Sequence, residues 1–187
     1  MNLGRRIAMD LTVAQERHMR RAAGTARLAW NQALAEHRAL SAAARAESDE
    51  AKRKAMWPTT ARLRASWTER RKTDLPWTSA FTKCAGAQAV IDLGGAFERF
   101  FEERRDAKRE GRETRRSFGA PRFKSRRRTT SAFALWNDQF SVADHYRFDA
   151  RPRATMRVPL LGEVRLREAV PGIGGILGCR VSLRRGR

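Results

Sequence analysis

The sequence Leu93-Gly-Gly-Ala-Phe-Glu-Arg-Phe-Phe101 belongs to the longest periodic segment of the chain, which runs from Ser79 to about Glu110. Apolar side chains recur there every three or four positions, namely at Phe81, Ala85, Ala89, Leu93, Phe97 and Phe100 or Phe101. This spacing places them on one face of a single long α-helix. We expect that face to be core, with Leu93, Phe97, Phe100 and Phe101 among the buried residues.

The same helix contains Val90-Ile-Asp-Leu-Gly-Gly95, which is similar to the strand and carboxylate that open an RNase-H-like or actin-like nucleotide site. The helical period continues through this stretch to Phe97 and no second carboxylate motif follows, so we reject that interpretation. Asp92 is then expected on the surface. Gly94 and Gly95 each cost a helix about 1 kcal/mol relative to Ala, so we expect a kink or a close helix contact there.

The N-terminal segment predicts a short strand and then a helix. Residues 5–11 can form the strand. Thr12 and Gln15 have the spacing of a capping box, in which each side chain bonds the backbone N–H of the other residue. A helix should therefore begin at this point, and we expect it to break at Gly24.

A second helix is expected over residues 26–34. Its period places Leu28 and Trp30 in an apolar stripe, and Arg27 and Asn31 on a neighbouring face. Two helices joined by a tight glycine turn would form a hairpin of the helix-turn-helix kind, a geometry that is common and by itself weak evidence of DNA binding.

Two further helices and a set of strands complete the expected elements. The helices cover residues 36–54, closed by Met56-Trp-Pro58, and residues 59–71. Beyond Ser131 the apolar period changes from 3.6 to 2, which predicts short strands. They cover residues 131–135, 139–142, 146–148, 156–160, 163–167 and 179–183. We expect these strands to close into a small barrel or a strongly bent sheet.

The charge of the chain points to a polyanionic partner. Its 40 Lys and Arg residues against 20 Asp and Glu give a formal net charge of +20 on 187 residues, which makes nucleic acid the first candidate. The window from Arg104 to Arg128 holds twelve cations and three acids, so nine of those net charges lie in one short segment. Much of the net positive charge is therefore concentrated in this one segment.

The most basic part of that window is Gly119-Ala-Pro-Arg-Phe-Lys-Ser-Arg-Arg-Arg128, which we call the connector. Pro121 prevents a helix, so the connector should be extended. Alternation then predicts that Phe123 packs on the core while Arg122 and Lys124 face the opposite side. With Arg126, Arg127 and Arg128, these two cations are expected to bind phosphates. The alternative is a solvated basic linker.

Several classes of protein are disfavoured by what the sequence lacks. Cys84 and Cys179 are isolated, and with only three His residues we expect neither a disulfide framework nor a zinc site, and no cofactor. No window approaches eighteen apolar residues and the first residues lack the apolar part of a signal peptide, so we expect no membrane partner. A reducing cytoplasm fits, with association to the nucleoid when the protein is bound to DNA.

Four motifs together resemble the N-terminal portion of the TnpB (OrfB) proteins of insertion sequences, which are relatives of the compact type V CRISPR effectors. The motifs are Ala23-Gly-Thr-Ala-Arg-Leu-Ala-Trp-Asn-Gln-Ala-Leu34, Leu93-Gly-Gly-Ala-Phe-Glu-Arg-Phe-Phe101, Gly119-Ala-Pro-Arg-Phe-Lys-Ser-Arg-Arg127 and Pro159-Leu-Leu-Gly-Glu-Val-Arg165. They occur in the order and spacing of that family and are spread over nearly the whole chain.

The resemblance implies an α+β fold, in which a helical recognition lobe is inserted after the first strand of a small β-barrel, closed or incomplete. The corresponding ranges are 1–11 for the first strand, 12–111 for the lobe with its helix-turn-helix-like start, 112–130 for the basic connector and 131–187 for the barrel strands. In the family these parts hold a guide RNA and read a short motif in double-stranded DNA beside the target.

The resemblance also implies which side chains contact nucleic acid. Lys83 matches a contact position of the family, whereas Ala87 stands where the family tends to have Gln, and Gln88 is one residue away from it. The expected nucleic-acid contacts are Arg27, Asn31, Lys83, Gln88, Arg122, Lys124, Arg126, Arg127 and Arg128. The expected core includes Leu28, Trp30, Leu93, Phe97, Phe100, Phe101 and Phe123.

In the family a RuvC nuclease, with three carboxylates for two metal ions, and a zinc ribbon follow the barrel. No such carboxylate set occurs before Arg187, so we expect no catalysis by this polypeptide. The leading hypothesis is a truncated, nucleic-acid-binding part of a TnpB-type protein, which could work with a separately encoded nuclease half. The alternatives are a stand-alone helix-turn-helix regulator using residues 15–39 and an inactive remnant of a decayed transposon gene.

Overall fold

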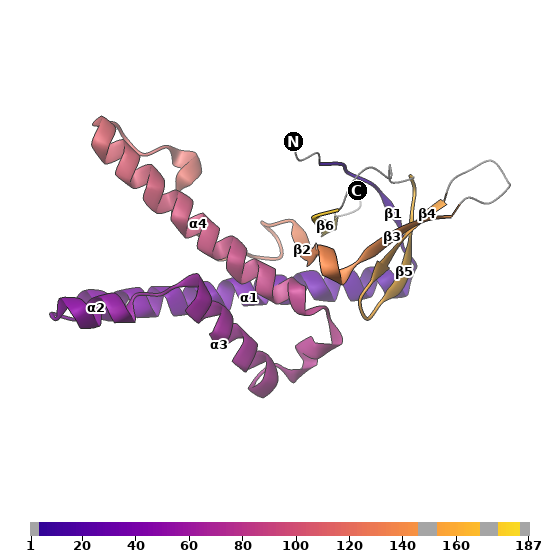
Figure 1. The fold of residues 1–187 in the computed structure, drawn as a ribbon, viewed down its shortest axis with the longest axis horizontal. Helices are drawn as coiled ribbons and strands as arrows, with labels where there is room; N and C mark the ends of the chain where they lie inside the picture. The colour runs from indigo at the N-terminus through magenta and orange to yellow at the C-terminus, as the bar shows by residue number, and fades with distance from the viewer. Residues whose placement is uncertain (1–3, 146–152, 169–175, 184–187) are drawn as a thin grey trace.

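The computed structural model describes residues 4–145, 153–168 and 176–183, and they form a mixed α+β protein (Figure 1). A helical lobe follows the short first strand β1 (Met9–Asp10), and two antiparallel sheets lie at the end of the lobe where its first helix begins. The predicted fold class, a helical lobe following the first strand of a β structure, is confirmed.

The first helix, α1 (Val13–Ala46), begins at the predicted capping box. The Gln15 backbone N–H donates to Thr12 Oγ1 at 3.2 Å, and the Thr12 N–H donates to Gln15 Oε1 at 3.0 Å. The Gln15 amide nitrogen also donates to the Glu163 carbonyl at 2.8 Å, which ties the start of α1 to the sheet. These bonds satisfy backbone donors that a helix start otherwise leaves without partners.

The predicted break at Gly24 is wrong, because α1 continues through it without a turn. Its neighbours Ala22, Ala23 and Ala26 are buried on the face of α1 that packs against the long helix α4 (Lys83–Glu110), whereas Gly24 itself is partly exposed and a Cβ there would lie 3.9 Å from the nearest atom, on Arg27. One glycine costs a helix about 1 kcal/mol, and tight packing of this face offsets that cost.

The helix predicted over residues 36–54 is divided in the structure. Residues 36–46 complete α1, and after a short break α2 (Glu50–Met56) begins at Asp49, whose side chain accepts from the Lys52 N–H at 3.0 Å. Helix α3 (Thr60–Thr73) starts one residue after its cap Thr59, close to the prediction. The 3₁₀ segment η1 (Pro76–Ala80) then leads to α4, which begins after Thr82 rather than at Ser79.

Helices α3 and α4 approach each other through glycines. A Cβ on Gly86 would lie 2.3 Å from Trp67 Cζ2, and a Cβ on Gly94 would lie 2.1 Å from Thr60 Oγ1. The close helix contact predicted around Gly94 is therefore confirmed, whereas a Cβ on Gly95 would come no nearer than 3.5 Å to a neighbour, the Nη1 atom of Arg99. Positions 86 and 94 require glycine because only a residue without a side chain lets the two helices come so near.

The core lies between α1, α4 and the strand β2 (Ser131–Trp136), which contacts both helices. Trp30 and Leu93 are buried in it. Four other residues expected in the core are only partly buried, namely Leu28, Phe97, Phe100 and Phe101, and of these Phe97 packs against the core. The three Phe residues lie on the half of α4 away from the sheets, where Phe97 stacks on His37 with the ring centroids 3.6 Å apart.

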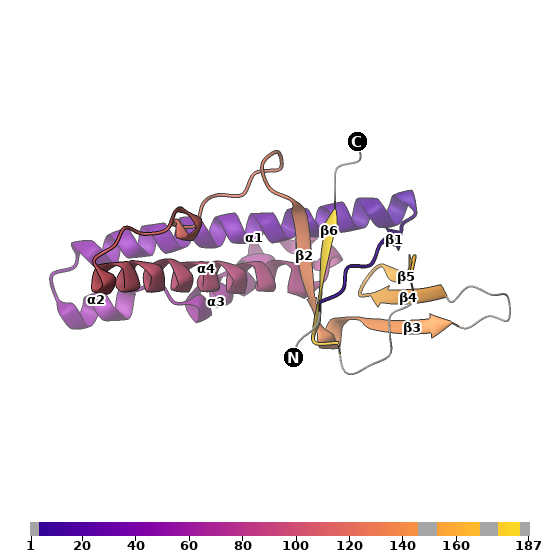
Figure 2. The same ribbon diagram turned by 90° about the horizontal axis from the view of Figure 1, so that it is seen from above.

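Two antiparallel sheets are formed by the described residues, and these residues close no barrel. One sheet has the order β1-β5-β4-β3 and pairs Met9 with Leu166, so the first strand joins the last third of the chain. Strands β2 and β6 form the other, with Phe133 opposite Val181 (Figure 2). The remaining bounds are β3 (Ser141–His145), β4 (Arg153–Val158), β5 (Gly162–Leu166), β6 (Gly178–Leu183), η2 (Arg116–Phe118) and η3 (Asn137–Gln139).

Five of the six strands predicted after Ser131 overlap a strand of the structure, each shifted by a few residues at most. The sixth, predicted over residues 146–148, lies outside the described residues.

Candidate nucleic-acid interface

The connector is fixed to α1 through its backbone. The Trp30 indole N–H donates to the Arg122 carbonyl at 2.9 Å. The Asn31 amide bonds both backbone groups of Lys124, donating to its carbonyl at 2.9 Å and accepting from its N–H at 2.8 Å. Arg38 donates to the Pro121 carbonyl at 3.4 Å. Residues 119–125 are therefore extended, as predicted, and held in one register along the helix, whereas residues 126–128, which were also expected to be extended, form a turn.

These bonds reverse the predicted side-chain directions. Lys124 turns inward, with its Nζ 3.4 Å from the centroid of the Trp30 ring, and Phe123 is 51% exposed. The prediction that Phe123 is a core residue and that Lys124 faces outward is wrong. Trp30 and Asn31 decide the register here, because they fix the backbone so that the lysine and not the phenylalanine lies over the helix.

The environment of Lys124 lowers the pKa of its amine. Burial lowers the pKa of its amine, the Asp92 carboxylate acts in the opposite direction, and Arg180 adds to the lowering. The face of the Trp30 ring partly replaces water as the partner of the cation. Lys124 therefore acts first as a packing residue between the connector and α1.

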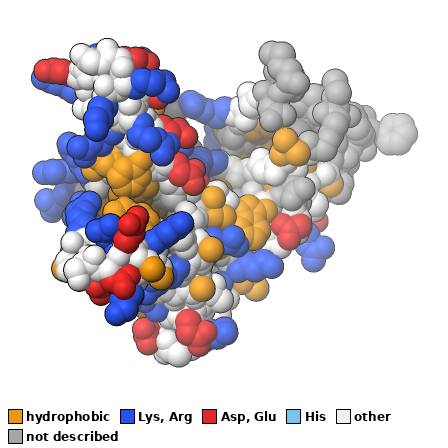
Figure 3. Space-filling model, turned by 60° about the vertical axis from the view of Figure 1, so that its left-hand side comes forward, with side chains coloured by type: hydrophobic (Ala, Val, Ile, Leu, Met, Phe, Trp, Pro, Cys, Tyr) orange, Lys and Arg blue, Asp and Glu red, His pale blue; other side chains and the backbone are white. Residues whose placement is uncertain are grey.

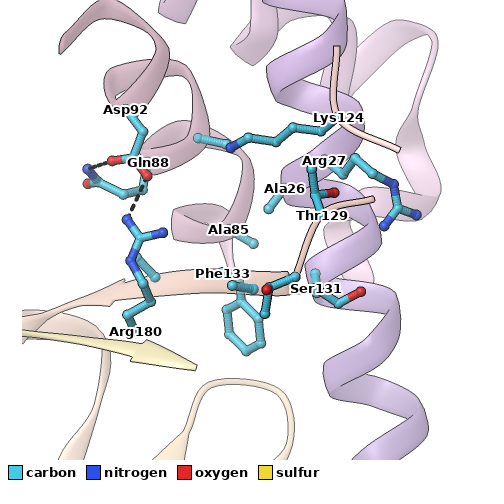
Figure 4. A pocket seen from close by; sticks show the side chains of 15 residues that line it. Ala26, Arg27, Ala85, Gln88, Asp92, Lys124, Thr129, Ser131, Phe133 and Arg180 are labelled. Atoms are coloured by element: carbon cyan, nitrogen blue, oxygen red, sulfur yellow. Dashed lines mark hydrogen bonds and ion pairs between the residues drawn. The ribbon is translucent and has the colours of Figure 1, made fainter. Parts of the chain in front are cut away.

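A small pocket lies where the connector, α1, α4 and β2 meet (Figure 4). Three of the residues predicted to contact nucleic acid, Arg27, Gln88 and Lys124, line it together with Arg180. Its cavity volume of about 80 Å³ is far below the several hundred Å³ typical of a small-molecule site. The pocket is thus a small polar gap between these elements.

Hydrogen bonds beside this pocket use both the nitrogen and the oxygen of the Gln88 side-chain amide. Its Nε2 donates to Asp92 Oδ1 at 2.9 Å, and its Oε1 accepts from the Trp136 indole N–H at 2.5 Å. The other Asp92 oxygen accepts from Arg180 at 2.7 Å. Asp92 is therefore not the plain surface residue that the sequence suggested, since it joins α4 to the second sheet. Sequence reasoning missed Arg180, and no local signal marked it, because its partner is distant in the chain.

The other residues that were predicted to contact nucleic acid do not line this pocket. Lys83 is exposed near the start of α4, and with 3.6 residues per turn it points about 140° around the helix from Gln88. Arg126, Arg127 and Arg128 form an exposed turn after the connector's extended part. Asn31 uses its amide on the Lys124 backbone, so the structure places it as a residue that positions the connector.

Some of the charge-dense window is neutralised within the protein. Glu103 is 6% exposed and accepts from Arg112 at 2.5 Å and from the Arg115 backbone N–H at 2.9 Å. The Arg112 hydrogen bond, followed by that of Arg115, lowers the pKa of Glu103 to about 2. Arg109 is likewise paired with Asp106.

Exposed cations remain on the connector itself. Within the described ranges, the side chains of Arg122, Arg127 and Arg128 are exposed and form no ion pair. Figure 3 shows that Lys and Arg side chains also surround hydrophobic side chains over the helical lobe. A surface of this kind offers both phosphate contacts and apolar contacts.

Comparison with known families bears on the first part of the chain. Residues 1–43 match the family model of a helix-turn-helix domain, that of OrfB proteins of the IS605 type. This match supports a TnpB/OrfB-family helix-turn-helix region at the N-terminus of the chain. In this structure the region comprises β1 and most of α1, the helix to which the connector is bound. No curated protein matches the chain.

The matched family domain is a DNA-binding and not a catalytic one, and it is associated with transposons. Within the described part of the chain, no group of three His, Cys, Asp or Glu side chains is arranged to hold a metal ion. No helix there is long and apolar enough to cross a membrane.

Proposed function

We propose that this chain is a nucleic-acid-binding protein of the TnpB type, which holds a guide RNA on the connector and target-adjacent duplex DNA on the helical lobe. Its role is binding, with phosphate contacts from exposed arginines of the connector. The family match over residues 1–43 supports DNA binding and a link to transposons. The assignment of RNA to the connector is our inference from its chemistry.

One observation carries the proposal: a basic segment is held by its backbone while its arginines point outward. Trp30 and Asn31 bond the backbone at Arg122 and Lys124, and Arg122 and the turn at 126–128 remain exposed. A solvated linker has no need of such anchoring. Fixed cations lose less conformational entropy when they meet phosphates than cations on a free chain do.

A stand-alone helix-turn-helix regulator is less well supported by the geometry. It would need a turn within residues 15–39 so that a second helix could enter the major groove. Helix α1 is continuous over that range, and much of its surface is buried against α4 and β2. DNA binding by this region would therefore use an exposed side of one long helix.

The proposal is tested by measuring binding against salt concentration. Replacing Arg122, Arg127 and Arg128 together by Ala should weaken binding to unrelated structured RNAs by similar factors, because phosphate contacts carry little sequence information. The slope of log affinity against log salt should shrink by about 0.7 to 0.9 for each phosphate that is no longer neutralised, or roughly 2 to 3 units in all.

The matched control removes the same charge elsewhere. Lys52, Arg53 and Lys54 are exposed on α2, and replacing them by Ala should leave the salt slope nearly unchanged. If both triple variants lower the slope equally, binding depends on net charge alone and the connector has no special role. If the connector variant keeps the parent's slope, the connector is a solvated linker and the proposal is wrong.

A further inference from the structure

The ring of Phe123 is exposed on a segment that is not free to move. It lies between three anchored backbone groups, the Pro121, Arg122 and Lys124 carbonyls, which accept from Arg38, Trp30 and Asn31 respectively. Yet the side chain itself is 51% exposed. A large aromatic ring held in water forgoes the stabilisation that burial would give an apolar side chain of this size. Such a ring is suited to a partner that covers it.

One side of the ring already has a partner. The Arg38 guanidinium lies over it, with Cζ 4.7 Å from the ring centroid, and the same guanidinium donates to the Pro121 carbonyl. Arg38 therefore holds the ring in place and adds a positive charge beside it. Stacking on a ring already fixed in this way costs little conformational entropy.

The surroundings of the ring suit a polyanion with flat, apolar groups. Arg122 is its exposed neighbour in sequence, and the exposed turn at 126–128 follows within a few residues. An extended chain spans at most about 3.5 Å per residue, so these arginines lie within about 20 Å of the ring. A nucleotide stacked on Phe123 would have its own and adjacent phosphates near them.

We propose that Phe123 is a stacking platform for an unpaired base of single-stranded nucleic acid, supported by Arg38 and flanked by the connector's arginines. This proposal rests on the proposed function and specifies what the connector binds. Bases inside a duplex are stacked on one another and present only their edges. The Phe123 ring can therefore stack only on a base that is not part of a duplex.

The test compares a labelled single-stranded oligonucleotide with a duplex of the same sequence. Replacing Phe123 by Leu should lower the single-strand affinity by about 5- to 150-fold and leave duplex affinity within about twofold. Because the phosphate-binding arginines are unchanged in this variant, the salt slope should stay that of the parent. Phe123→Trp should retain the single-strand affinity, because an indole stacks at least as well as a phenyl ring.

A second exposed aromatic residue gives a matched control. Trp77 is 47% exposed in η1, outside the connector, and Trp77→Leu should leave the single-strand affinity unchanged. The melting temperature of Phe123→Leu should equal that of the parent, since the ring is not in the core.

The outcomes separate this proposal from the one on which it rests. If the parent chain binds neither ligand, the proposed function itself fails, and the stacking role with it. If the parent binds but Phe123→Leu binds single strands equally well, only the stacking role is wrong. Equal losses on single strand and duplex, a reduced salt slope, or an equal loss in Phe123→Trp would also overturn it.

Discussion

Gly86 lets α3 and α4 pack closely, and replacing it by Ala should destabilise the protein. The added Cβ would lie 2.3 to 2.4 Å from three atoms of the Trp67 indole, about 1 Å short of the 3.4 Å at which ordinary contact begins. Trp67 is rigid and 3% exposed, so the helices themselves would have to separate. Overpacking of this kind costs about 3 kcal/mol, at the upper end of its usual range, and Ala regains about 1 kcal/mol of helix propensity. The expected net decrease in unfolding free energy is about 2 kcal/mol.

The assay is urea unfolding followed by far-ultraviolet circular dichroism, with two comparisons. Gly24→Ala is the same substitution where the nearest atom is 3.9 Å away, and it should stabilise α1 by about 0.5 to 1 kcal/mol. In a Trp67→Phe background, Gly86→Ala should cost at least about 1 kcal/mol less, because the clashing indole atoms are gone. A neutral or stabilising Gly86→Ala would refute the close helix contact. A destabilisation above about 1 kcal/mol for Gly24→Ala would show that Gly24 forms a turn.

Two further predictions concern the connector and the buried carboxylate before it. Asn31→Ala removes both side-chain bonds to the Lys124 backbone, so trypsin should cut the connector several times faster, and an unchanged cleavage rate would contradict the anchoring. The pKa of Glu103 falls from 4.5 to about 2 on folding, so its contribution to stability is present above pH 4.5 and is lost as the pH falls toward 2. Parent and Glu103→Gln should therefore differ more in urea midpoint near neutral pH than at about pH 3, and an equal difference at both would show that the bonds to Arg112 and Arg115 do not lower this pKa in solution.

Signals that act within a few residues predicted the starts of α1 and α3. The capping box of Thr12 and Gln15 is complete in four residues, and Thr59 caps α3 in the same local way. Gly24 misled the prediction because its effect depends on packing: a glycine marks a turn when its neighbours are exposed, but here the adjacent alanines are buried against α4. The sequence alone does not show that α4 packs against this part of α1.

The candidate site shows the same limit. That the connector is extended and basic follows from Pro121 and the arginines alone. Which side chains turn inward depends on Trp30 and Asn31, which lie some ninety residues earlier and bond the backbone rather than the side chains. Arg180 could not be predicted either, because it meets Asp92 only through the pairing of β6 with β2.

The pairing of β1 with β5 has a consequence for how the chain acquires its structure during synthesis. Residues 13–110 can form α1 to α4 and much of their shared core as soon as they leave the ribosome, since most of their contacts are with one another and the rest are mainly with β2. Met9 and Asp10 must wait for Leu166 and Arg165, and β2 must wait for β6. Long-range pairings of this kind form late and slowly. The nascent protein therefore has a folded helical lobe while β1 and β2 are still unpaired. During that interval the short length of these strands and the charged residues beside them limit pairing with strands of other chains.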